Sequence, residues 1–503
     1  MDILYGLGHG FGVALQPQNI VWCFLGCFLG TVVGILPGLG PAATIAILMP
    51  LTLNMDPAGG IIMLAGIYYG AKYGGSTTSI LLNMPGESSS VVSCIDGYQM
   101  ALKGRAGAAL GIAAISSFIA GTVGIVLLTL VAPAVARFAL SFSSPEYFAL
   151  MVFGLSLVVL LSGASLLKGL LALLVGLWLS TVGIDLFTAQ SRFTFGRPEL
   201  LGGLDFVVIA IGVFAIAEIM ATLQNRSEGR LIPVPKGFRN LLPNREELMA
   251  SRFAFFNGSI TGFVIGVLPG AGSAIASFIA YGIEKAVSKR KELFGHGAPE
   301  GLAAPEGANN ADTGGALVPL LTLGIPGGGT TAILLSALIL WGVRPGPLMI
   351  TESPDIFWGL VASMYVGNVV LLLLNLPLVP AFAQLLRVPK WVLFPVIFGL
   401  AIIGAYSVSG RIFDVELLAA FGLLGFLMAK LGFPSAPLIL GFVLGDAMER
   451  ALRQSLMMSQ GDITSLFQRP ISLTLLIGAA IILILPMVGF INRFRVRAIS
   501  EGA

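Results

Sequence analysis

Gly34-Ile-Leu-Pro37-Gly38-Leu-Gly40 interrupts an apolar stretch that starts near Ile20 and is otherwise long enough to span a membrane as a helix. Proline removes a helix hydrogen bond and glycine loosens the backbone, so the helix should break here. The pattern recurs 232 residues later as Gly266-Val-Leu-Pro269-Gly270-Ala-Gly272. Unpaired peptide groups are costly in a bilayer unless protein or a water-filled cavity satisfies them. Two such breaks at matching places therefore predict a binding site.

Further blocks repeat in the same order on either side of the chain's middle. The matching pairs are Gly74-Gly75 with Gly314-Gly315, Asn83-Met-Pro85-Gly86 with Gly324-Ile-Pro326-Gly327, and Phe153-Gly-Leu with Phe398-Gly-Leu. The second pair of prolines is 241 residues apart, and the phenylalanines are 245 apart. Because the offset grows slowly while the order is kept, the pattern indicates an internal duplication.

The composition predicts a membrane protein. Hydrophobic residues make up 56% of the chain and charged residues 11%, whereas soluble domains have about a quarter charged residues. The apolar stretches predict an all-α polytopic membrane protein with about 10 to 12 transmembrane helices. We expect two inverted-topology repeats with broken helices or re-entrant hairpins, as in many secondary transporters.

Four segments follow from the repeat and the distribution of charge. We predict a first membrane repeat over residues 1–223, a basic linker over 224–252, a second membrane repeat over 253–470, and an extra transmembrane helix with a tail over 471–503. Positive residues favour cytoplasmic loops, which places the linker and the tail (Arg493, Arg495, Arg497) in the cytoplasm. The first 18 residues contain no Lys or Arg, so we expect no cleaved signal peptide.

The broken ends after Pro37-Gly38 and Pro269-Gly270 should present free N–H groups and a positive dipole end to an anion. A single Pro-Gly-x-Gly motif more often serves helix packing, because small residues let helices approach closely. Its repetition beside blocks rich in hydroxyl groups favours an anion site instead. Asn309, Asn310 and Asp312 offer the hard oxygen ligands of a candidate sodium site.

Lys72 is an ionisable residue in an apolar neighbourhood. Such a residue suggests a function, here the attraction of a carboxylate. A structural interpretation stays open beside it, in which the long side chain reaches the membrane interface.

The motifs of other protein classes are missing. We find no G-x-S-x-G, H-E-x-x-H or G-x-x-x-x-G-K-[ST] pattern, so an enzyme or a chain that binds ATP is not indicated. The three cysteines form no C-x-x-C pair, and we expect no cofactor beyond a coupling ion, Na+ or H+. Scattered basic residues without an extended basic face predict no nucleic-acid partner.

Gly34–Gly40, Tyr68–Glu87 with Asp96-Gly-Tyr98, and Ala304–Pro326 together resemble the large membrane (permease) subunit of the tripartite tricarboxylate transporter family. The resemblance spans almost the whole chain. It implies a multi-pass subunit of the bacterial inner membrane that works with a small four-helix membrane subunit and a periplasmic solute-binding protein. It also implies import of a di- or tricarboxylate similar to citrate, driven by an ion gradient.

With the motifs mapped onto this chain, the expected substrate-site residues are Pro37, Gly38, Gly40, Lys72, Ser76, Thr77, Thr78, Asn83, Pro85, Gly86, Ser88, Pro269, Gly270, Gly272, Ser273, Pro326, Gly327, Gly328 and Thr330. Lys72 and Asp312-Thr313 depart from the family pattern, so citrate itself is not assumed. Two alternatives stay open. One is a stand-alone sodium-coupled anion symporter or channel, and the other is a membrane enzyme that uses carboxylates such as Glu87 or Glu218.

Overall fold

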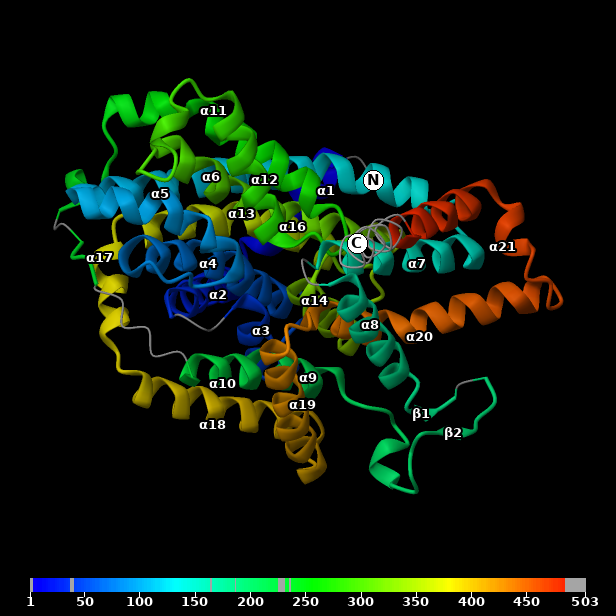
Figure 1. Ribbon diagram of the computed structural model, residues 1–503. Helices are drawn as coiled ribbons and strands as arrows, with labels where there is room; N and C mark the ends of the chain where they lie inside the picture. The colour runs from blue at the N-terminus through cyan, green and yellow to red at the C-terminus, as the bar shows by residue number, and fades with distance from the viewer. Residues whose placement is uncertain are drawn as a thin grey trace, which may run out of the picture. The chain divides into compact units, whose positions relative to one another are not determined.

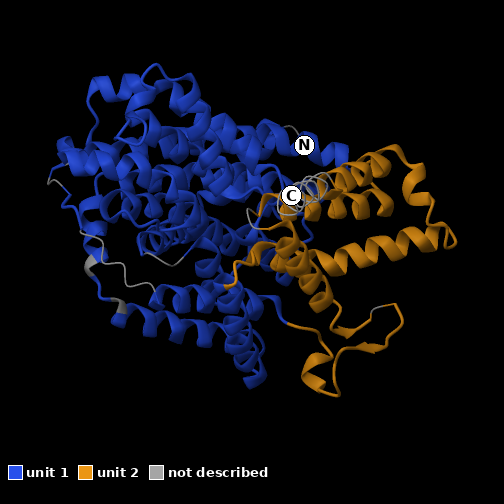
Figure 2. Cartoon of the chain, viewed as in Figure 1, with its two compact units in different colours: residues 1–140, 205–430 blue, residues 141–204, 431–503 orange. Residues whose placement is uncertain are grey.

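The computed structural model describes residues 3–36, 40–162, 165–185, 187–224, 231–234 and 237–484. The chain forms two compact units, coloured separately in Figure 2. Unit 1 comprises residues 1–140 and 205–430, and unit 2 comprises residues 141–204 and 431–503. Each unit therefore contains segments from both halves of the sequence.

Unit 1 holds most of the helices, labelled in Figure 1. Its α-helices are α1 (Ile3–Ala14), α2 (Pro17–Ile35), α3 (Pro41–Thr52), α4 (Pro57–Leu82), α5 (Ser93–Met100), α6 (Ala106–Ala139), α9 (Phe206–Ala210), α10 (Ala217–Gln224), α11 (Arg245–Gly266), α12 (Gly272–Val287), α13 (Pro299–Leu323), α14 (Gly329–Leu340), α15 (Met349–Glu352), α16 (Pro354–Asn375), α17 (Val379–Phe382), α18 (Lys390–Ser409) and α19 (Ile412–Lys430). Short 3-10 or π turns lie at Ser88–Val91, Ala101–Arg105, Ile211–Ile216, Phe238–Leu241, Lys291–Leu293 and Ala383–Arg387.

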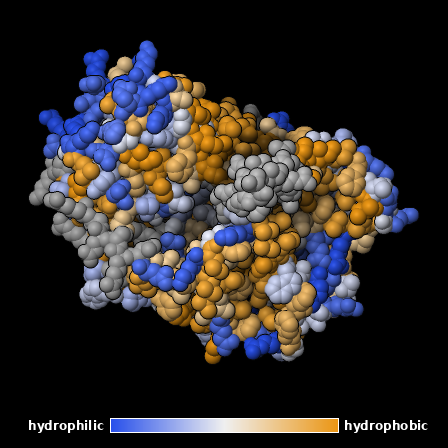
Figure 3. Space-filling model, in the orientation of Figure 1, coloured by the Kyte–Doolittle hydropathy of each residue, from blue (hydrophilic) through white to orange (hydrophobic). Residues whose placement is uncertain are grey.

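The prediction of an all-α polytopic membrane protein is confirmed. Eight of the described helices are long and apolar enough to cross a membrane, and five further apolar helices have 10–17 residues. Figure 3 shows hydrophilic residues gathered over α5 and α11, while hydrophobic residues cover much of the remaining visible surface. The predicted number of 10 to 12 crossings came from a count of apolar stretches. In the structure several apolar stretches form helices that are too short to cross a membrane alone, such as α3 and α14.

Two pairs of helices in unit 1 pack with their backbones in direct contact. We call the first contact the α2–α4 seam. A Cβ added at Gly26, Gly30 or Gly34 of α2 would lie only 2.3, 2.5 or 2.3 Å from a carbonyl oxygen of α4, those of Met63, Ile67 and Ala71 respectively. Only glycine permits this approach.

The α11–α13 seam repeats this contact. A Cβ added at Gly258, Gly262 or Gly266 of α11 would lie 2.5, 2.3 or 2.5 Å from the carbonyl oxygens of Ala304, Ala308 and Asp312 of α13. The glycines of the two seams are 232 residues apart (258 − 26), and their partners are 241 apart (304 − 63). These are the offsets of the two proline pairs found in the sequence, so the duplication extends to individual backbone contacts.

The register of the contacts gives the directions of these helices. Residue numbers rise together along both sides of each seam, so α2 runs parallel to α4 and α11 runs parallel to α13. α4 and α13, in contrast, run antiparallel. Gly97 of α5 lies beside both Ile80 of α4 and Leu302 of α13, and Ser76 of α4 contacts Glu306 of α13. Residue numbers therefore rise along α4 in the direction in which they fall along α13. The two pairs therefore run in opposite directions, as an inverted repeat requires.

Because α2 and α4 are parallel, the short helix α3 between them must return the chain toward the level at which α2 begins. α2 and α3 thus form a re-entrant hairpin, one of the two forms predicted. α12 has the same place between α11 and α13. The second interruption, around Gly270, lies at the turn between α11 and α12.

Unit 2 consists of α7 (Ser144–Leu161), α8 (Leu166–Ser180), α20 (Ser435–Met458), α21 (Ser465–Gln468), a helix over Pro470–Ile484, a short turn at Pro198–Leu200, and the antiparallel strands β1 (Gly183–Ile184) and β2 (Ser191–Arg192). One of the long apolar stretches of the sequence, over residues 150–171, is divided between two helices. The structure ends α7 at Leu161 and begins α8 at Leu166, where Ser162 and Ser165 flank a Gly-Ala step. The predicted last crossing ends at Ile484 among the described residues, and the basic tail lies outside them.

Candidate functional site

Each half of unit 1 brings its two interruptions together. In the second half, the Gly270 N–H donates a 2.8 Å hydrogen bond to the Gly327 carbonyl. In the first half, a Cβ added at Gly86 would lie 2.3 Å from the Gly34 carbonyl oxygen. The predicted site residues Pro37 and Gly38 lie outside the described residues. The loops that the sequence treated as separate motifs are therefore neighbours within each half.

The second interruptions have the same local fold in both halves. Asn83 caps the end of α4 and Gly324 caps the end of α13, and both residues have left-handed backbone angles, with φ of 56° and 69°. Glu87 and Gly328 each lie four residues after the capping residue. The Ser90 hydroxyl accepts from the Glu87 N–H and donates to the Glu87 carbonyl, and Thr331 does the same for Gly328. The two loops differ in that the first carries a carboxylate where the second has a glycine.

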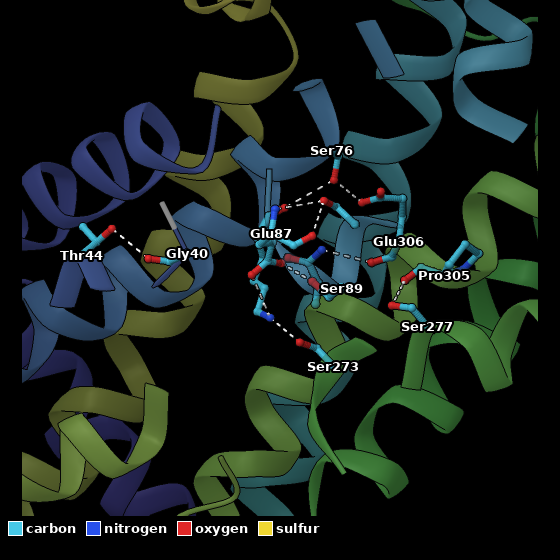
Figure 4. Close-up of polar contacts among 12 residues, drawn as sticks. Gly40, Thr44, Ser76, Glu87, Ser89, Ser273, Ser277, Pro305 and Glu306 are labelled. Atoms are coloured by element: carbon cyan, nitrogen blue, oxygen red, sulfur yellow. Dashed lines mark hydrogen bonds and ion pairs between the residues drawn. The ribbon is translucent and has the colours of Figure 1, made fainter. Parts of the chain in front are cut away.

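Lys72 is where the two halves meet. Its Nζ lies 3.3 Å from Glu87 Oε2 on the first half's loop and donates a hydrogen bond to the Ser273 hydroxyl on the second half's α12. The Tyr68 ring lies beneath the ammonium, 5.6 Å from Nζ to the ring centroid. Figure 4 shows Glu87 and Ser273 converging on this point from different elements.

This ion pair is deeply buried. The Lys72 and Glu87 side chains are each 4% exposed, and among the described residues Lys72 is the one buried lysine or arginine. A buried ammonium is stable only when it is paired and hydrogen-bonded. Of the two interpretations left open by the sequence, the structure places Lys72 in the interior rather than at an interface.

A second buried carboxylate lies next to the pair. Glu306 of α13 accepts hydrogen bonds from the hydroxyls of Ser76 on α4 and Ser93 on α5, as Figure 4 shows for Ser76. The Asn310 side-chain amide donates to the Glu306 carbonyl and to the Ser117 hydroxyl. Polar groups of both halves thus form one connected network around α13.

The candidate sodium ligands lie on the same helix. Asn309, Asn310 and Asp312 are each at most 4% exposed, and Asn309 Oδ1, Asn310 Oδ1 and Asp312 Oδ1 accept no hydrogen bond from the described residues. Buried oxygens normally have a partner, and neutral and charged oxygens are the ligands that Na+ prefers. The residues present therefore fit a small hard cation. No cluster of three or more His, Cys, Asp or Glu that would hold a transition metal occurs in the described part of the chain.

Other predicted residues line or frame this region. Thr77 and Ser76 border a small cavity of about 10 Å³ together with Ser117 and Asn375, about the volume needed for a water molecule. The Thr78 hydroxyl donates to the Ile35 carbonyl at the end of α2. Gly40 begins α3, and its carbonyl accepts the Thr44 hydroxyl at 3.1 Å, which is visible in Figure 4.

The remaining predicted residues lie in the interruptions themselves. Pro326 and Gly327 are buried, Pro269, Gly272, Gly328 and Thr330 are half-buried, and Asn83, Pro85 and Ser88 are exposed. The exposed three surround the buried Gly86 and Glu87 in the sequence. They belong to the loop that presents Glu87, on the side away from Lys72.

The sequence prediction missed three residues that contact this centre. Glu87, Glu306 and Ser93 were not in the list of expected substrate-site residues. Glu87 pairs with Lys72 and Glu306 accepts a hydrogen bond from Ser76, both of which were expected, and Ser93 donates to Glu306. A signal was available, since a buried lysine requires a counter-charge and carboxylates are rare in apolar helices.

Comparisons with known proteins agree with the fold. Residues 20–440 match the model of the tripartite tricarboxylate transporter TctA family. An uncharacterized 52.8 kDa protein in the TAR-I ttuC' 3' region of Agrobacterium vitis is 50% identical over 485 residues, which cover 96% of each chain. An uncharacterized protein in the TAR-II ttuC' 3' region of the same organism is 46% identical over 215 residues, 43% of this chain and 89% of that protein. No solved structure matches the chain.

Proposed function

The chain belongs to the tripartite tricarboxylate transporter TctA family, and we propose that it imports a di- or tricarboxylate across the bacterial inner membrane as the large subunit of a binding-protein-dependent, ion-gradient-driven secondary transporter. The family makes it the large membrane subunit of a three-part transport system rather than a member of an enzyme family. The two other parts are a small four-helix membrane subunit and a periplasmic solute-binding protein.

The observation that supports carboxylate transport is the buried ammonium of Lys72 between the interrupted hairpins of two opposed repeats. The Gly270 N–H expected to face an anion is bonded to the Gly327 carbonyl, so the support comes from Lys72. Inverted repeats meet near the middle of the membrane in secondary transporters. The Ser273 hydroxyl accepts a hydrogen bond from Lys72, so its own hydrogen can be donated to a carboxylate beside the ammonium. Neutral donors bind a carboxylate weakly enough for it to be released again.

Reconstitution tests this proposal. The large subunit with its small subunit is placed in liposomes under a pH or sodium gradient, and uptake of radiolabelled citrate, succinate and malate is measured with and without the cognate binding protein. We expect uptake only when all three parts and a gradient are present. Uptake by the large subunit alone would instead favour a stand-alone symporter or channel. Formation of a chemical product in detergent would favour a membrane enzyme.

We further propose that Asn309, Asn310 and Asp312 bind sodium on α13. Replacing Asp312 with asparagine removes the one charged ligand, so the sodium concentration for half-maximal stabilisation should rise about tenfold or more. The measurement is the melting temperature of the purified protein in NaCl against KCl, because a ligand that binds the folded state raises it.

Asp446→Asn is the matched control for this variant. Asp446 is an exposed acid on α20 of unit 2, where it pairs with Arg450. Its replacement should leave the sodium dependence as it is in the unaltered protein. Equal sodium stabilisation of the Asp312→Asn variant and the unaltered protein would exclude α13 as the site.

A further inference from the structure

We propose that Glu87 is an internal anion that occupies Lys72 until substrate displaces it, and that the displaced carboxylate takes up a proton which crosses the membrane with the substrate. This inference rests on the proposed function and adds a coupling site to it. It concerns a residue that the sequence did not assign to the site, and it is separate from any cation held by α13.

The surroundings of Lys72 leave no free place for a second carboxylate. Its ammonium already contacts the Glu87 carboxylate and the Ser273 hydroxyl, with the Tyr68 ring beneath it. Both members of the ion pair are 4% exposed. A substrate carboxylate that reaches the ammonium must therefore take the place of Glu87.

The displaced Glu87 cannot remain a bare carboxylate at this depth. Leaving one charge of a buried pair without its partner is strongly destabilising, and a carboxyl group removes that cost by binding a proton. The proton comes from the water that accompanies the substrate and forms an O–H bond on Glu87. When the substrate leaves on the other side, Glu87 returns to Lys72 and that O–H bond breaks, which releases the proton to the water there. Substrate and proton binding are thus linked in both directions.

The groups facing Glu87 are few. Lys72 and Tyr68 face it from α4, and Glu306 and Asp312 face it from α13. α12 contributes the uncharged Ser273, which shares Lys72 with Glu87, and Ser89 donates a hydrogen bond to Glu87 from the same loop. Lys72 is therefore the single cation among the described groups that face Glu87, and the carboxylates of α13 offer it no alternative partner.

Comparison of the two repeats separates the role of Glu87 from the folding of its loop. Gly328 lies at the equivalent position, 241 residues later, and its backbone makes the same two hydrogen bonds with Thr331 that the Glu87 backbone makes with Ser90. The loop therefore folds this way without a side chain at that position. Replacing the carboxylate should consequently spare the loop.

The test uses the complete three-part transporter in liposomes that contain a pH-sensitive dye. The probe is radiolabelled succinate or citrate, whichever the unaltered transporter takes up, at about pH 8 where their carboxyls are ionised. Glu87→Gln should keep substrate exchange between equal pools within about threefold of the unaltered protein. Accumulation driven by a pH gradient of about one unit should fall about tenfold, and the dye should report no proton entry with substrate. Glu87→Asp should retain both, and Glu246→Gln, at an exposed acid in the first turn of α11, is the matched control.

Calorimetry on the unaltered transporter gives a test that needs no variant. The heat of substrate binding is measured at the same pH in two buffers of different ionisation enthalpy, and a proton should be taken up for each anion bound. No proton uptake, or proton entry in Glu87→Gln equal to that of the unaltered protein, would overturn the inference even if substrate is transported. Failure of the unaltered transporter to move any of the carboxylates would instead overturn the proposed function.

Discussion

Replacing Lys72 with glutamine is expected to lower carboxylate uptake by about 100-fold or more. Lys72 is the one buried cation among the described residues, and it lies between the interruptions of both repeats. Removing one member of a buried charge pair costs about 2–5 kcal/mol, which corresponds to roughly 30-fold to several thousand-fold in affinity. The measurement is the concentration dependence of uptake in liposomes that contain the complete transporter.

Two further variants separate loss of binding from loss of folding. Lys72→Gln leaves Glu87 without a partner, so the double variant Lys72→Gln/Glu87→Gln removes that carboxylate as well and should recover thermal stability without recovering uptake. Lys168→Gln, which alters a lysine of unit 2 that bonds the Leu431 carbonyl, should transport as the unaltered protein does. Uptake by the double variant at the unaltered rate would show that Lys72 does not bind the substrate.

Replacing Gly270 with valine should reduce uptake at least about tenfold while the protein still inserts into the membrane. Gly270 has a φ of +84°, which a β-branched residue adopts only at a cost of about 1–3 kcal/mol. Its N–H also holds the two interruptions of the second repeat together through the Gly327 carbonyl. Valine should move this N–H and separate the interruptions. Uptake and the amount of protein in the membrane fraction are measured together.

Gly410→Val is the matched control for backbone strain. Gly410 ends α18 with a φ of +67°, and no atom lies within 4 Å of a Cβ added there. It therefore imposes similar strain without touching either interruption. If both valine variants lose uptake equally, the effect of Gly270→Val is general destabilisation and its loop is not part of the site.

The sequence predicted the features of the fold that follow from short motifs. Proline beside glycine within an apolar stretch marks a helix break wherever it occurs, and the spacing of Pro37 from Pro269 disclosed the repeat. The structure extends that spacing to the glycines of both seams. The division of the stretch over residues 150–171 into α7 and α8 was missed, because serine, glycine and alanine are also frequent within membrane helices.

The site was predicted less completely than the fold. Residues within the motifs, such as Lys72, Ser76 and Ser273, were named from the sequence, and the structure brings them together at one buried place. Their partners were missed because pairing depends on the antiparallel contact of α4 with α13, which brings Ser76 and Glu306, 230 residues apart, within hydrogen-bonding distance. No local pattern encodes such a contact. Glu87 lies inside a motif and was named from the sequence as a carboxylate of an alternative membrane enzyme, but its pairing with Lys72 was not predicted.

The glycine contacts within each pair also restrict how this protein can change shape. Every fourth residue of α4 and α13 has its carbonyl group directly against a glycine of the facing helix. A small sliding of one helix along the other would replace these glycines with residues that carry side chains, which would clash with the carbonyl groups. Only a step of a whole helical turn, about 5 Å, would restore an equivalent fit. The paired helices should therefore move as rigid units during transport, and we expect the short helix α3 to move relative to them. A chemical crosslink between α2 and α4 should leave turnover unchanged, whereas one that ties down α3 should stop it.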